Sequence, residues 1–443
     1  MTRLFGTDGI RGVANEDLTP KLAYDLGRAT ASHLLGGKGR ILVGQDTRRS
    51  GDMLVAAVAA GAMSLGVDVD RLGVCPTPAL ALLTAEGGYS AGVMVSASHN
   101  PASDNGLKVV DGRGFKLDDV VEDELETHLL RADELAGPQN EHVGRMHDAH
   151  DLLQTYVERR MVLARSFSYS GRIVIDCANG SGCLVAPQIL AGTGADVESW
   201  FNEPDGININ LECGATAPEQ AARAVTASNA DIGFALDGDA DRCVAIDEHG
   251  DVVDGDQLIG IIALDRLSRA QLHDGIVIAS VLSNGGLERA LTQAGGRLAR
   301  TPVGDKYILE GMVMMGAGLG GEKSGHVIIS EHTNAGDGIV TALEILSIVA
   351  RTGRPLSELA AQIPLFPQQQ RTIHVRHKDQ WEADPTFARA VDDARASLDG
   401  VGRVLVRPSG TEPALRIMVE GEDHTRVSAV ADQLAALAAE RLN

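Results

Sequence analysis

A serine at the end of a predicted strand is the first candidate for chemistry. Residues 92–106, GVMVSASHNPASDNG, hold a β-branched run that ends at Ser96 and a polar turn that contains Ser98. Pro101 fixes its own φ angle and favours an extended residue before it, which presents Ser98 at a strand end, where α/β sheets bind ligands. A serine hydroxyl needs activation to act as a nucleophile, and the adjacent His99 need not be its base. Taken alone, the segment also fits a Ser/Asn turn without chemistry.

Three aspartates alternate with small residues in DIGFALDGDADRCVAID, residues 231–247. Carboxylates at this spacing can converge on one cation, and ligation by oxygen alone suits a hard ion such as Mg²⁺. A solvated acidic turn is the alternative. The aspartates are Asp237, Asp239 and Asp241.

An EF-hand loop is a rival interpretation of the same segment, because it also begins D-x-D-x-D and Glu248 falls at its twelfth position. Its sixth position, however, holds Arg242 where glycine is required, and predicted strands rather than helices flank it. The EF-hand interpretation is therefore rejected.

A third segment, RPSGTEP at residues 407–413, lies between two predicted strands. Arg407 offers a planar set of donors, Ser409 and Thr411 offer hydroxyls, and Gly410 lets backbone N–H groups approach an anion. These groups together suit a phosphate, although an ordinary hairpin turn has the same composition.

Further polar residues are weak evidence individually. In GGEKSGH, residues 320–326, Glu322 and Ser324 could hydrogen-bond to sugar hydroxyls and His326 could approach a phosphate. Each of these residues, and each cation elsewhere in the chain, could equally belong to the surface. The cations are Arg11 in LFGTDGIRG, Arg48 in QDTRRSG and Lys108 in DNGLK.

Composition narrows the function classes. The chain has 443 residues, 44% of them apolar, which predicts several domains with sizeable cores. Its net charge of −22 argues against nucleic-acid or anionic-membrane binding. Five cysteines without a C-x-x-C argue against a disulfide framework or a zinc site, and indicate a reduced, cytoplasmic setting. The sequence shows no signal peptide and no membrane-spanning apolar run, so we expect a protein without a membrane partner.

One strand–turn–helix pattern occurs three times, at residues 40–65, 172–193 and 275–294. Each copy begins with a β-branched run, as in RILVGQ, RIVID and GIVIAS, and continues into a Gly-containing turn and an Ala/Leu-rich segment. Strands that alternate with helices predict α/β layers. Three related α/β domains explain the pattern; unrelated α/β units are the alternative.

The C-terminal part has a different pattern. Strands are predicted at 371–377, 402–408 and 414–421, followed by a helix with one apolar stripe. This predicts a small α+β domain. Pro364, Pro367 and the Gln368–Gln370 run indicate the linker before it, and the polar stretch at 137–155 indicates an earlier boundary.

The four motifs, in this order along essentially the whole chain, resemble the α-D-phosphohexomutase superfamily. The resemblance implies an α/β fold of four domains around a central cleft. Three related α/β domains with mixed sheets would carry the phosphoserine loop (1–152), the metal-binding loop (153–256) and the sugar-binding loop (257–367). A smaller α+β domain (368–443) would carry the phosphate-binding loop.

The resemblance also implies roles for the residues named above. Ser98 matches the phosphorylated serine, and Asp237, Asp239 and Asp241 match the Mg²⁺ ligands, with the Ser98 phosphate completing the shell. Arg11, Lys108 and His326 match active-site groups; Lys108 or His326 is the better candidate for proton transfer, because arginine is a poor base. The sugar-reading pair would be Glu322 and Ser324, and the distal phosphate would be held by Arg407, Ser409, Gly410 and Thr411.

The opening LFGTDGIRGVAN, TPVGDKYI at 301–308 and Gly410 resemble the amino-sugar branch of the superfamily. The implied reaction is glucosamine 6-phosphate ⇌ glucosamine 1-phosphate through a sugar 1,6-bisphosphate, on the route to UDP-N-acetylglucosamine, by a monomer or homodimer. Pro302, Lys306 and Lys323 depart from the pattern of that branch. The alternatives are a phosphomannomutase/phosphoglucomutase with the same mechanism, a non-catalytic phosphosugar-binding protein, and a phosphatase.

Overall fold

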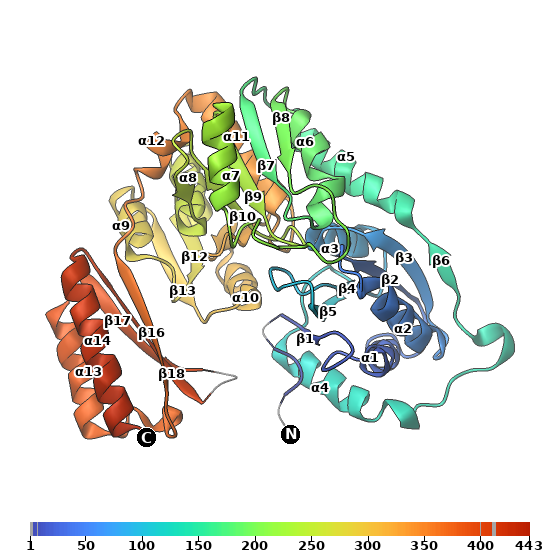
Figure 1. Ribbon diagram of the computed structural model, residues 1–443. Helices are drawn as coiled ribbons and strands as arrows, with labels where there is room; N and C mark the ends of the chain where they lie inside the picture. Colours follow the sequence, from blue (N-terminus) through green and yellow to red (C-terminus); the bar gives the residue numbers. More distant parts are fainter. Residues whose placement is uncertain (1–2, 7, 399, 410–412) are drawn as a thin grey trace. The chain divides into compact units, whose positions relative to one another are not determined.

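Four sheets organise the computed structural model, which describes residues 3–6, 8–398, 400–409 and 413–443 (Figure 1). Contacts divide the chain into a larger unit, residues 1–282 and 294–362, and a smaller unit, residues 283–293 and 363–443. The predicted α/β fold with mixed sheets and a smaller C-terminal α+β part is confirmed. Short 3₁₀ helices occupy Ala132–Glu134, Asn140–His142, His150–Leu152, Ser181–Leu184, His273–Gly275 and Lys378–Gln380.

The first sheet places Ser98 after its central strand β4. Strands β2, β3, β4 and β6 are parallel, whereas β5 runs antiparallel to both β1 and β4. Helix α1 begins where Thr19 accepts a hydrogen bond from the Leu22 N–H, with Pro20 in its first turn. The sheet order is β1 (Ile10–Val13), β5 (Asp104–Asp111), β4 (Ala91–Val95), β2 (Arg40–Gln45), β3 (Asp68–Val74) and β6 (Met146–Asp148). The helices are α1 (Pro20–His33), α2 (Gly51–Met63), α3 (Thr77–Glu86) and α4 (Asp119–Leu130).

The second sheet carries the aspartate triad between two antiparallel strands. β7 consists of RIVID, and apart from the exposed Arg172 at its start its residues are buried, as expected for a strand covered on both faces. The sheet order is β11 (Val252–Val253), β10 (Cys243–Ile246), β9 (Ile232–Leu236), β7 (Arg172–Asp176) and β8 (Asp196–Trp200). Its helices are α5 (Leu153–Ala164), α6 (Ala186–Ala191) and α7 (Glu219–Ser228).

The third sheet places the GGEKSGH segment in the turn between β14 and β15. Strand β12 pairs in parallel with both β13 and β14, and β14 pairs antiparallel with β15. Its order is β13 (Arg297–Thr301), β12 (Ile276–Ser280), β14 (Leu319–Gly321) and β15 (Val327–Ile329). The helices of this part are α8 (Gly255–Ser268), α10 (Asp305–Met315), α11 (Gly338–Thr352) and α12 (Leu356–Ala360).

Within its described residues, the smaller unit contains an antiparallel sheet, three α-helices and the 3₁₀ helix Lys378–Gln380. Its core includes Phe387, Ile417 and Leu434, each at most 2% exposed. The predicted linker at Gln368–Gln370 is wrong, because these glutamines pair with β18 inside strand β16. The sheet order is β16 (Gln368–His374), β18 (Ala414–Gly421) and β17 (Gly402–Pro408), with helices α9 (Gly285–Gln293), α13 (Pro385–Ser397) and α14 (His424–Arg441).

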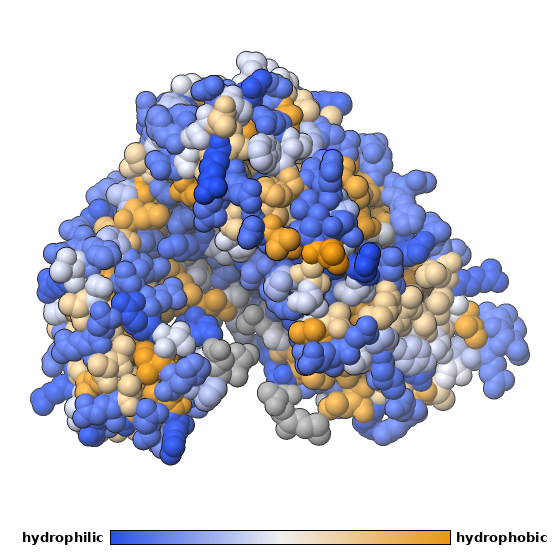
Figure 2. Space-filling view, viewed as in Figure 1, coloured by the Kyte–Doolittle hydropathy of each residue, from blue (hydrophilic) through white to orange (hydrophobic). Residues whose placement is uncertain are grey.

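The surface is mainly hydrophilic on the face that Figure 2 draws. Apolar patches between the hydrophilic side chains are small there. The five cysteines are free. Within the described residues, no helix is both long enough and apolar enough to cross a bilayer.

Candidate active site

Ser98 is fully buried and adopts a left-handed backbone conformation, with φ of 51°. Its hydroxyl donates to Oδ2 of Asp237 over 2.5 Å, and its backbone N–H donates to the Ser96 hydroxyl over 2.9 Å. Nδ1 of His99 lies 3.3 Å from the Ser98 Oγ. Burial, and then the positive charges of Arg242 and Arg11, lower the pKa of His99 to about 4. The Ser98 hydroxyl therefore lies between the carboxyl group of Asp237 and the neutral imidazole of His99.

A buried arginine supports this unusual turn. The side chain of Arg48 is completely buried and pairs with Asp46, its Nε lying 2.9 Å from Oδ2. The amide of Asn210, which comes from the second sheet's part of the chain, donates to the backbone oxygens of Ser98 and Asn100 over 2.8 and 3.0 Å. Because non-glycine residues are strained at positive φ, such a turn needs surrounding contacts to persist. The Arg48 guanidinium also donates to the backbone oxygens of Ser98, Asn100, Pro101 and Asp104.

We predict that Arg48→Lys lowers kcat at least about tenfold while leaving the fold intact, because an ammonium cannot reach four carbonyl groups and each buried unsatisfied group costs about 1–3 kcal/mol. Arg49→Lys, the same change at the adjacent exposed position, is the control. Steady-state kinetics and thermal melting of both variants check the prediction. Equal turnover in the two variants would contradict it.

The aspartate triad occupies the loop between β9 and β10. Asp237, Asp239 and Asp241 are each at most 2% exposed, and one carboxylate oxygen from each lies within 4.8 Å of the others. Burial, and then repulsion from Asp241 and Asp239, raise the pKa of Asp237 well above its ordinary value. Oδ1 of Asp239 and Oδ1 of Asp241 are buried without a hydrogen-bond partner. Oδ1 of Asp241 does lie 3.8 Å from Nε of Arg242, in an ion pair. Buried carboxylate oxygens that lack hydrogen bonds are the groups that a divalent cation would satisfy.

Separate elements hold the backbone of this loop. The carbonyl of Gly238 accepts from Ser181 N–H over 2.9 Å, and that of Ala240 accepts from Gly338 N–H over 3.0 Å. Glycine is required at position 238, since a Cβ there would lie 2.6 Å from the backbone oxygen of Ser98. The loop is thereby fixed against the serine turn, and the donor set fits Mg²⁺ in charge, hardness and burial.

Lys108 and Arg11, the two predicted cations, both belong to this network. Nζ of Lys108 lies 2.8 Å from Oδ2 of Asp239 and 3.0 Å from Oδ2 of Asp8. Burial acts to lower the pKa of Lys108, but Asp239, Asp8 and Asp241 outweigh it and the pKa is raised. Arg11 donates to the side chain of Asn100 over 3.4 Å and pairs with Asp8. Lys108 thus contacts the triad directly, whereas Arg11 joins the network through Asn100 and Asp8.

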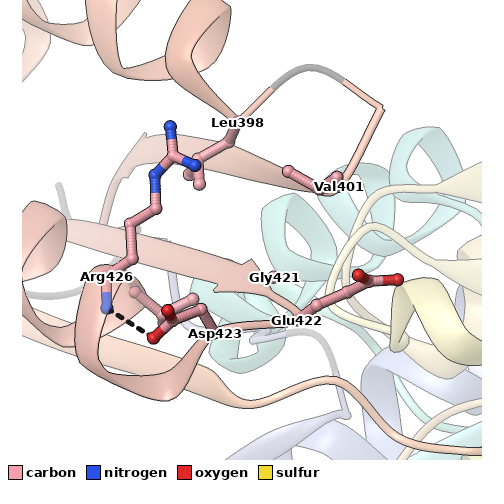
Figure 3. A pocket seen from close by; sticks show the side chains of 7 residues that line it. Leu398, Val401, Gly421, Glu422, Asp423 and Arg426 are labelled. Carbon is pink, nitrogen blue, oxygen red and sulfur yellow. Dashed lines mark hydrogen bonds between the residues drawn. The ribbon is translucent and has the colours of Figure 1, made fainter.

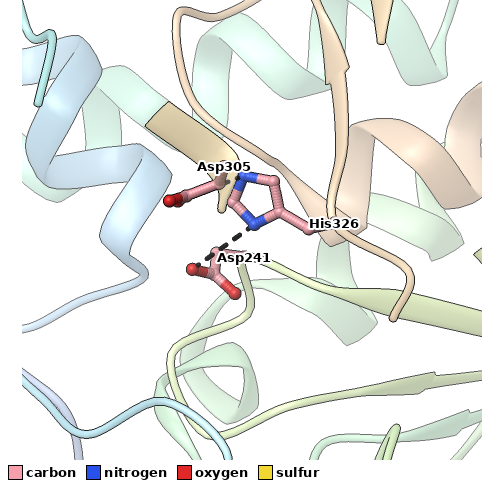
Figure 4. Close-up of side chains that lie close together, drawn as sticks. All are labelled: Asp241, Asp305 and His326. Carbon is pink, nitrogen blue, oxygen red and sulfur yellow. Dashed lines mark ion pairs between the residues drawn. The ribbon is translucent and has the colours of Figure 1, made fainter. Parts of the chain in front are cut away.

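His326 lies between two carboxylates (Figure 4). Its Nδ1 is 3.6 Å from Asp241 and its Nε2 is 3.6 Å from Asp305. Burial opposes protonation, but the charge of Asp241 and then that of Asp305 raise the pKa of His326. Nε2 also accepts the Gly336 N–H over 3.1 Å, so the first proton belongs on Nδ1, facing Asp241. In this arrangement His326 orients a member of the triad.

The segment after β14 borders a cavity of about 140 Å³ beside the triad. Oε1 of Glu322 accepts the Gly304 N–H over 3.1 Å, whereas the buried Oγ of Ser324 has no hydrogen-bond partner. Lys323 extends outward, with a side chain 43% exposed and 3.9 Å from Asp254. The cavity is lined by Asp8, Asp241, Arg242, Val303, Gly304, Asp305, Glu322 and His326, so it collects polar groups from all three α/β parts.

The predicted anion loop belongs to the smaller unit. Arg407 on β17 pairs in register with Arg416 on β18, and burial, followed by the charge of Arg416, lowers the pKa of Arg407. The backbone oxygen of Ser409 accepts from Nζ of Lys378 over 2.5 Å. Cationic side chains thus gather at the base of the loop. Gly410 and Thr411 lie outside the described residues.

A second cavity, of about 170 Å³, lies within the smaller unit (Figure 3). Leu398 and Val401 supply apolar walls, and Asp423 accepts hydrogen bonds from the N–H groups of Thr425 and Arg426. That carboxylate caps helix α14, so its presence there is explained by the fold.

Comparison with protein families gives matches along most of the chain. Four domain models described as phosphoglucomutase/phosphomannomutase match in chain order: α/β/α domain I at residues 2–136, domain II at 154–250, domain III at 254–366 and the C-terminal domain at 373–437.

Curated relatives and solved structures agree with these matches. A phosphoglucosamine mutase of Moorella thermoacetica is 50% identical over 427 residues, covering 96% of both chains. One from Symbiobacterium thermophilum is 47% identical and covers 98% of both. A crystal structure of a phosphoglucomutase/phosphomannomutase family protein from Burkholderia thailandensis superposes with a TM-score of 0.84 at 27% identity, covering 99% of this chain and 98% of the other. The fold is also that of the Aspergillus fumigatus N-acetylphosphoglucosamine mutase in complex with GlcNAc-6P and magnesium, with a TM-score of 0.68, 19% identity and coverage of 100% and 96%.

Proposed function

The chain belongs to the phosphoglucomutase/phosphomannomutase family, and on that premise we propose that it is a phosphoglucosamine mutase, which interconverts glucosamine 6-phosphate and glucosamine 1-phosphate. The name carried by its full-length relatives supports the choice of sugar. The observation that carries the chemistry is the buried Ser98 hydroxyl, 2.5 Å from a carboxylate of the aspartate triad.

The proposed reaction is two phosphoryl transfers. Phosphorylated Ser98 gives its phosphoryl group to O1 of glucosamine 6-phosphate: the bond between phosphorus and the Ser98 oxygen breaks, the bond to O1 forms, and the proton lost by O1 is balanced by one taken up by the Ser98 oxygen. The resulting 1,6-bisphosphate turns over in the site and its 6-phosphoryl group returns to the Ser98 oxygen. The Ser98 hydroxyl loses its proton and O6 takes one up, leaving glucosamine 1-phosphate. Since such transfers need little covalent assistance, positioning and charge stabilisation by the surrounding residues do most of the work.

The residues of the larger unit divide this work. Asp237, Asp239 and Asp241 would hold Mg²⁺ together with the phosphate on Ser98, and the ion would neutralise charge on the transferring group. Lys108 adds positive charge at the same point. Because its pKa is raised, it is protonated, and we propose that it donates a proton to the oxygen that leaves phosphorus and regains one from the attacking hydroxyl, with Arg11 beside it. In this proposal His326 orients Asp241.

Binding of the sugar phosphate is assigned to two loops. Glu322 and Ser324 would hydrogen-bond to sugar hydroxyls, since one borders the polar cavity and the other has an unused hydroxyl. The distal phosphate would be held by Arg407, Ser409, Gly410 and Thr411. The proposed domains are 1–152, 153–256, 257–367 and 368–443. We propose that the enzyme acts in the cytoplasm, on the route to UDP-N-acetylglucosamine. Its five free cysteines fit that location.

The substrate assignment is tested by comparing kcat/KM for glucosamine, glucose and mannose 6-phosphates. We expect glucosamine 6-phosphate to be preferred at least about tenfold, because a site that pairs with a substrate's amino group leaves buried polar groups unpaired when that group is missing. Equal or faster turnover of mannose 6-phosphate would overturn the amino-sugar assignment and leave the mutase assignment standing.

A further inference from the structure

We propose that Thr77 is a positioning residue, which aims the carboxylate of Asp239 at the cation proposed for the triad. Thr77 is the first residue of α3 and comes from the first sheet's part of the chain, 162 positions before Asp239. Its hydroxyl donates to Oδ2 of Asp239 over 2.5 Å, and both residues are buried. This is the length of a charge-assisted hydrogen bond between a hydroxyl and a carboxylate.

Thr77 holds Asp239 at two points. Besides the hydroxyl contact, the Thr77 N–H donates to the backbone oxygen of Asp239 over 2.9 Å. Pro76 precedes Thr77, and its fixed φ restricts the turn that enters α3. Threonine is also stiff at χ1 because it is β-branched. One rigid residue, Thr77, therefore holds both the main chain and the side chain of Asp239.

This contact fixes the orientation of the Asp239 carboxylate plane, and so the direction in which its second oxygen faces a cation. Oδ2 accepts from Thr77 and also from Nζ of Lys108, 2.8 Å away. Oδ1 is buried and has no hydrogen-bond partner. Because both donors bind one oxygen, turning the carboxylate plane to an intermediate χ2 angle would break both hydrogen bonds, so the other oxygen stays directed away from Thr77 and Lys108. Partners that orient a ligand in this way typically change metal affinity about 10- to 100-fold when they are removed.

Lys108 alone does not give the same orientation. Its single ammonium group lies 3.0 Å from Asp8 and 3.8 Å from Asp241, as well as near Asp239. A charge shared among three carboxylates on a flexible stem attracts Asp239 without fixing its plane. The short, buried hydroxyl of Thr77 supplies the direction that Lys108 lacks.

The test uses Thr77→Val, which keeps the shape of the side chain and removes its hydroxyl, and Thr77→Ser, which keeps the hydroxyl. Mn²⁺ serves as the probe, and its binding to the full chain is followed by electron paramagnetic resonance, with all proteins in the Ser98-dephosphorylated form verified by intact mass. We expect Thr77→Val to bind Mn²⁺ about 10- to 100-fold more weakly than the wild type, and Thr77→Ser to stay within about threefold of it.

A second readout separates orientation from general damage. In turnover assays, the Mg²⁺ concentration for half-maximal rate should rise in Thr77→Val by the factor seen with Mn²⁺, and saturating Mg²⁺ should restore most of kcat. A folding defect would lower kcat at every Mg²⁺ concentration. If Thr77→Val does not fold, Thr77→Ala replaces it, with the same expectation relative to Thr77→Ser.

The inference rests on the proposed metal site, and the two can fail separately. If the wild type binds Mn²⁺ neither in the dephosphorylated form nor with Ser98 phosphorylated, the metal site itself is wrong. If the wild type binds Mn²⁺ and Thr77→Val binds it equally well, the metal site stands and the role of Thr77 is overturned. Equal weakening in Thr77→Ser and Thr77→Val would also overturn it, because the hydroxyl would then not be the cause.

Discussion

Ser98→Ala is expected to lower kcat at least about a thousandfold. The substitution removes the hydroxyl that accepts and donates the phosphoryl group. The variant should fold normally, since the substitution removes a single oxygen and alanine tolerates the turn that Arg48 and Asn210 hold. Assays of turnover in both directions, with thermal melting as the check on folding, measure the effect.

The matched control is Ser103→Ala, the same change on an exposed residue of the same loop. It should keep wild-type kinetics. A sugar 1,6-bisphosphate should activate wild-type enzyme that has lost its phosphate, and should leave Ser98→Ala inactive because no acceptor hydroxyl remains. Recovery of Ser98→Ala by the bisphosphate would contradict the proposed nucleophile.

Asp239→Asn is the substitution with the second largest expected effect, a fall in kcat of at least about a hundredfold. The amide has nearly the same shape as the carboxylate, so the packing around the loop should persist. It lacks the negative charge that holds Mg²⁺ and that balances Lys108, 2.8 Å away. Binding of Mg²⁺ and turnover should fall together. Asp251→Asn, on an exposed residue of the turn that connects β10 to β11, should change neither.

Chelation gives the same test without a mutation. Enzyme in excess EDTA should lose activity and regain it when Mg²⁺ is restored. Full turnover under chelation, in protein shown to be free of metal, would contradict the proposed requirement for Mg²⁺.

Much of the local structure could be predicted from the sequence. The strands at 402–408 and 414–421 have the predicted limits, because β-branched runs between turn residues are a local signal. The aspartate triad could be predicted for the same reason, because carboxylates that alternate with small residues within five positions are a local signal of a shared cation site. The prediction of a linker at the glutamines after Pro367 is wrong because a polar run also suits a strand at the edge of a sheet; here Gln368 and Gln369 are partly buried and Gln370 is exposed.

The partners of the site residues could not be predicted in this way. Arg48 and Asn210 both bind the backbone of Ser98, yet they lie 50 and 112 residues from it, and neither is part of a periodic pattern. Thr77 resembles any residue at the start of a helix until the fold brings α3 to the triad. Grouping of α9 with the smaller unit likewise depends on packing between segments far apart in the sequence. Long-range contacts of this kind follow from the tertiary fold and leave no local signature.

Transfer of labelled phosphate to Ser98 tests the central claim most directly. Dephosphorylated enzyme is incubated with a glucosamine 1,6-bisphosphate that carries ¹⁸O-labelled phosphoryl groups, and the modified peptide is then sequenced by mass spectrometry. The account predicts one labelled phosphoryl group on Ser98, which glucosamine 6-phosphate removes again with formation of bisphosphate. An enzyme that turns over while Ser98 stays unlabelled, or that carries the label on another residue, would contradict the proposed mechanism.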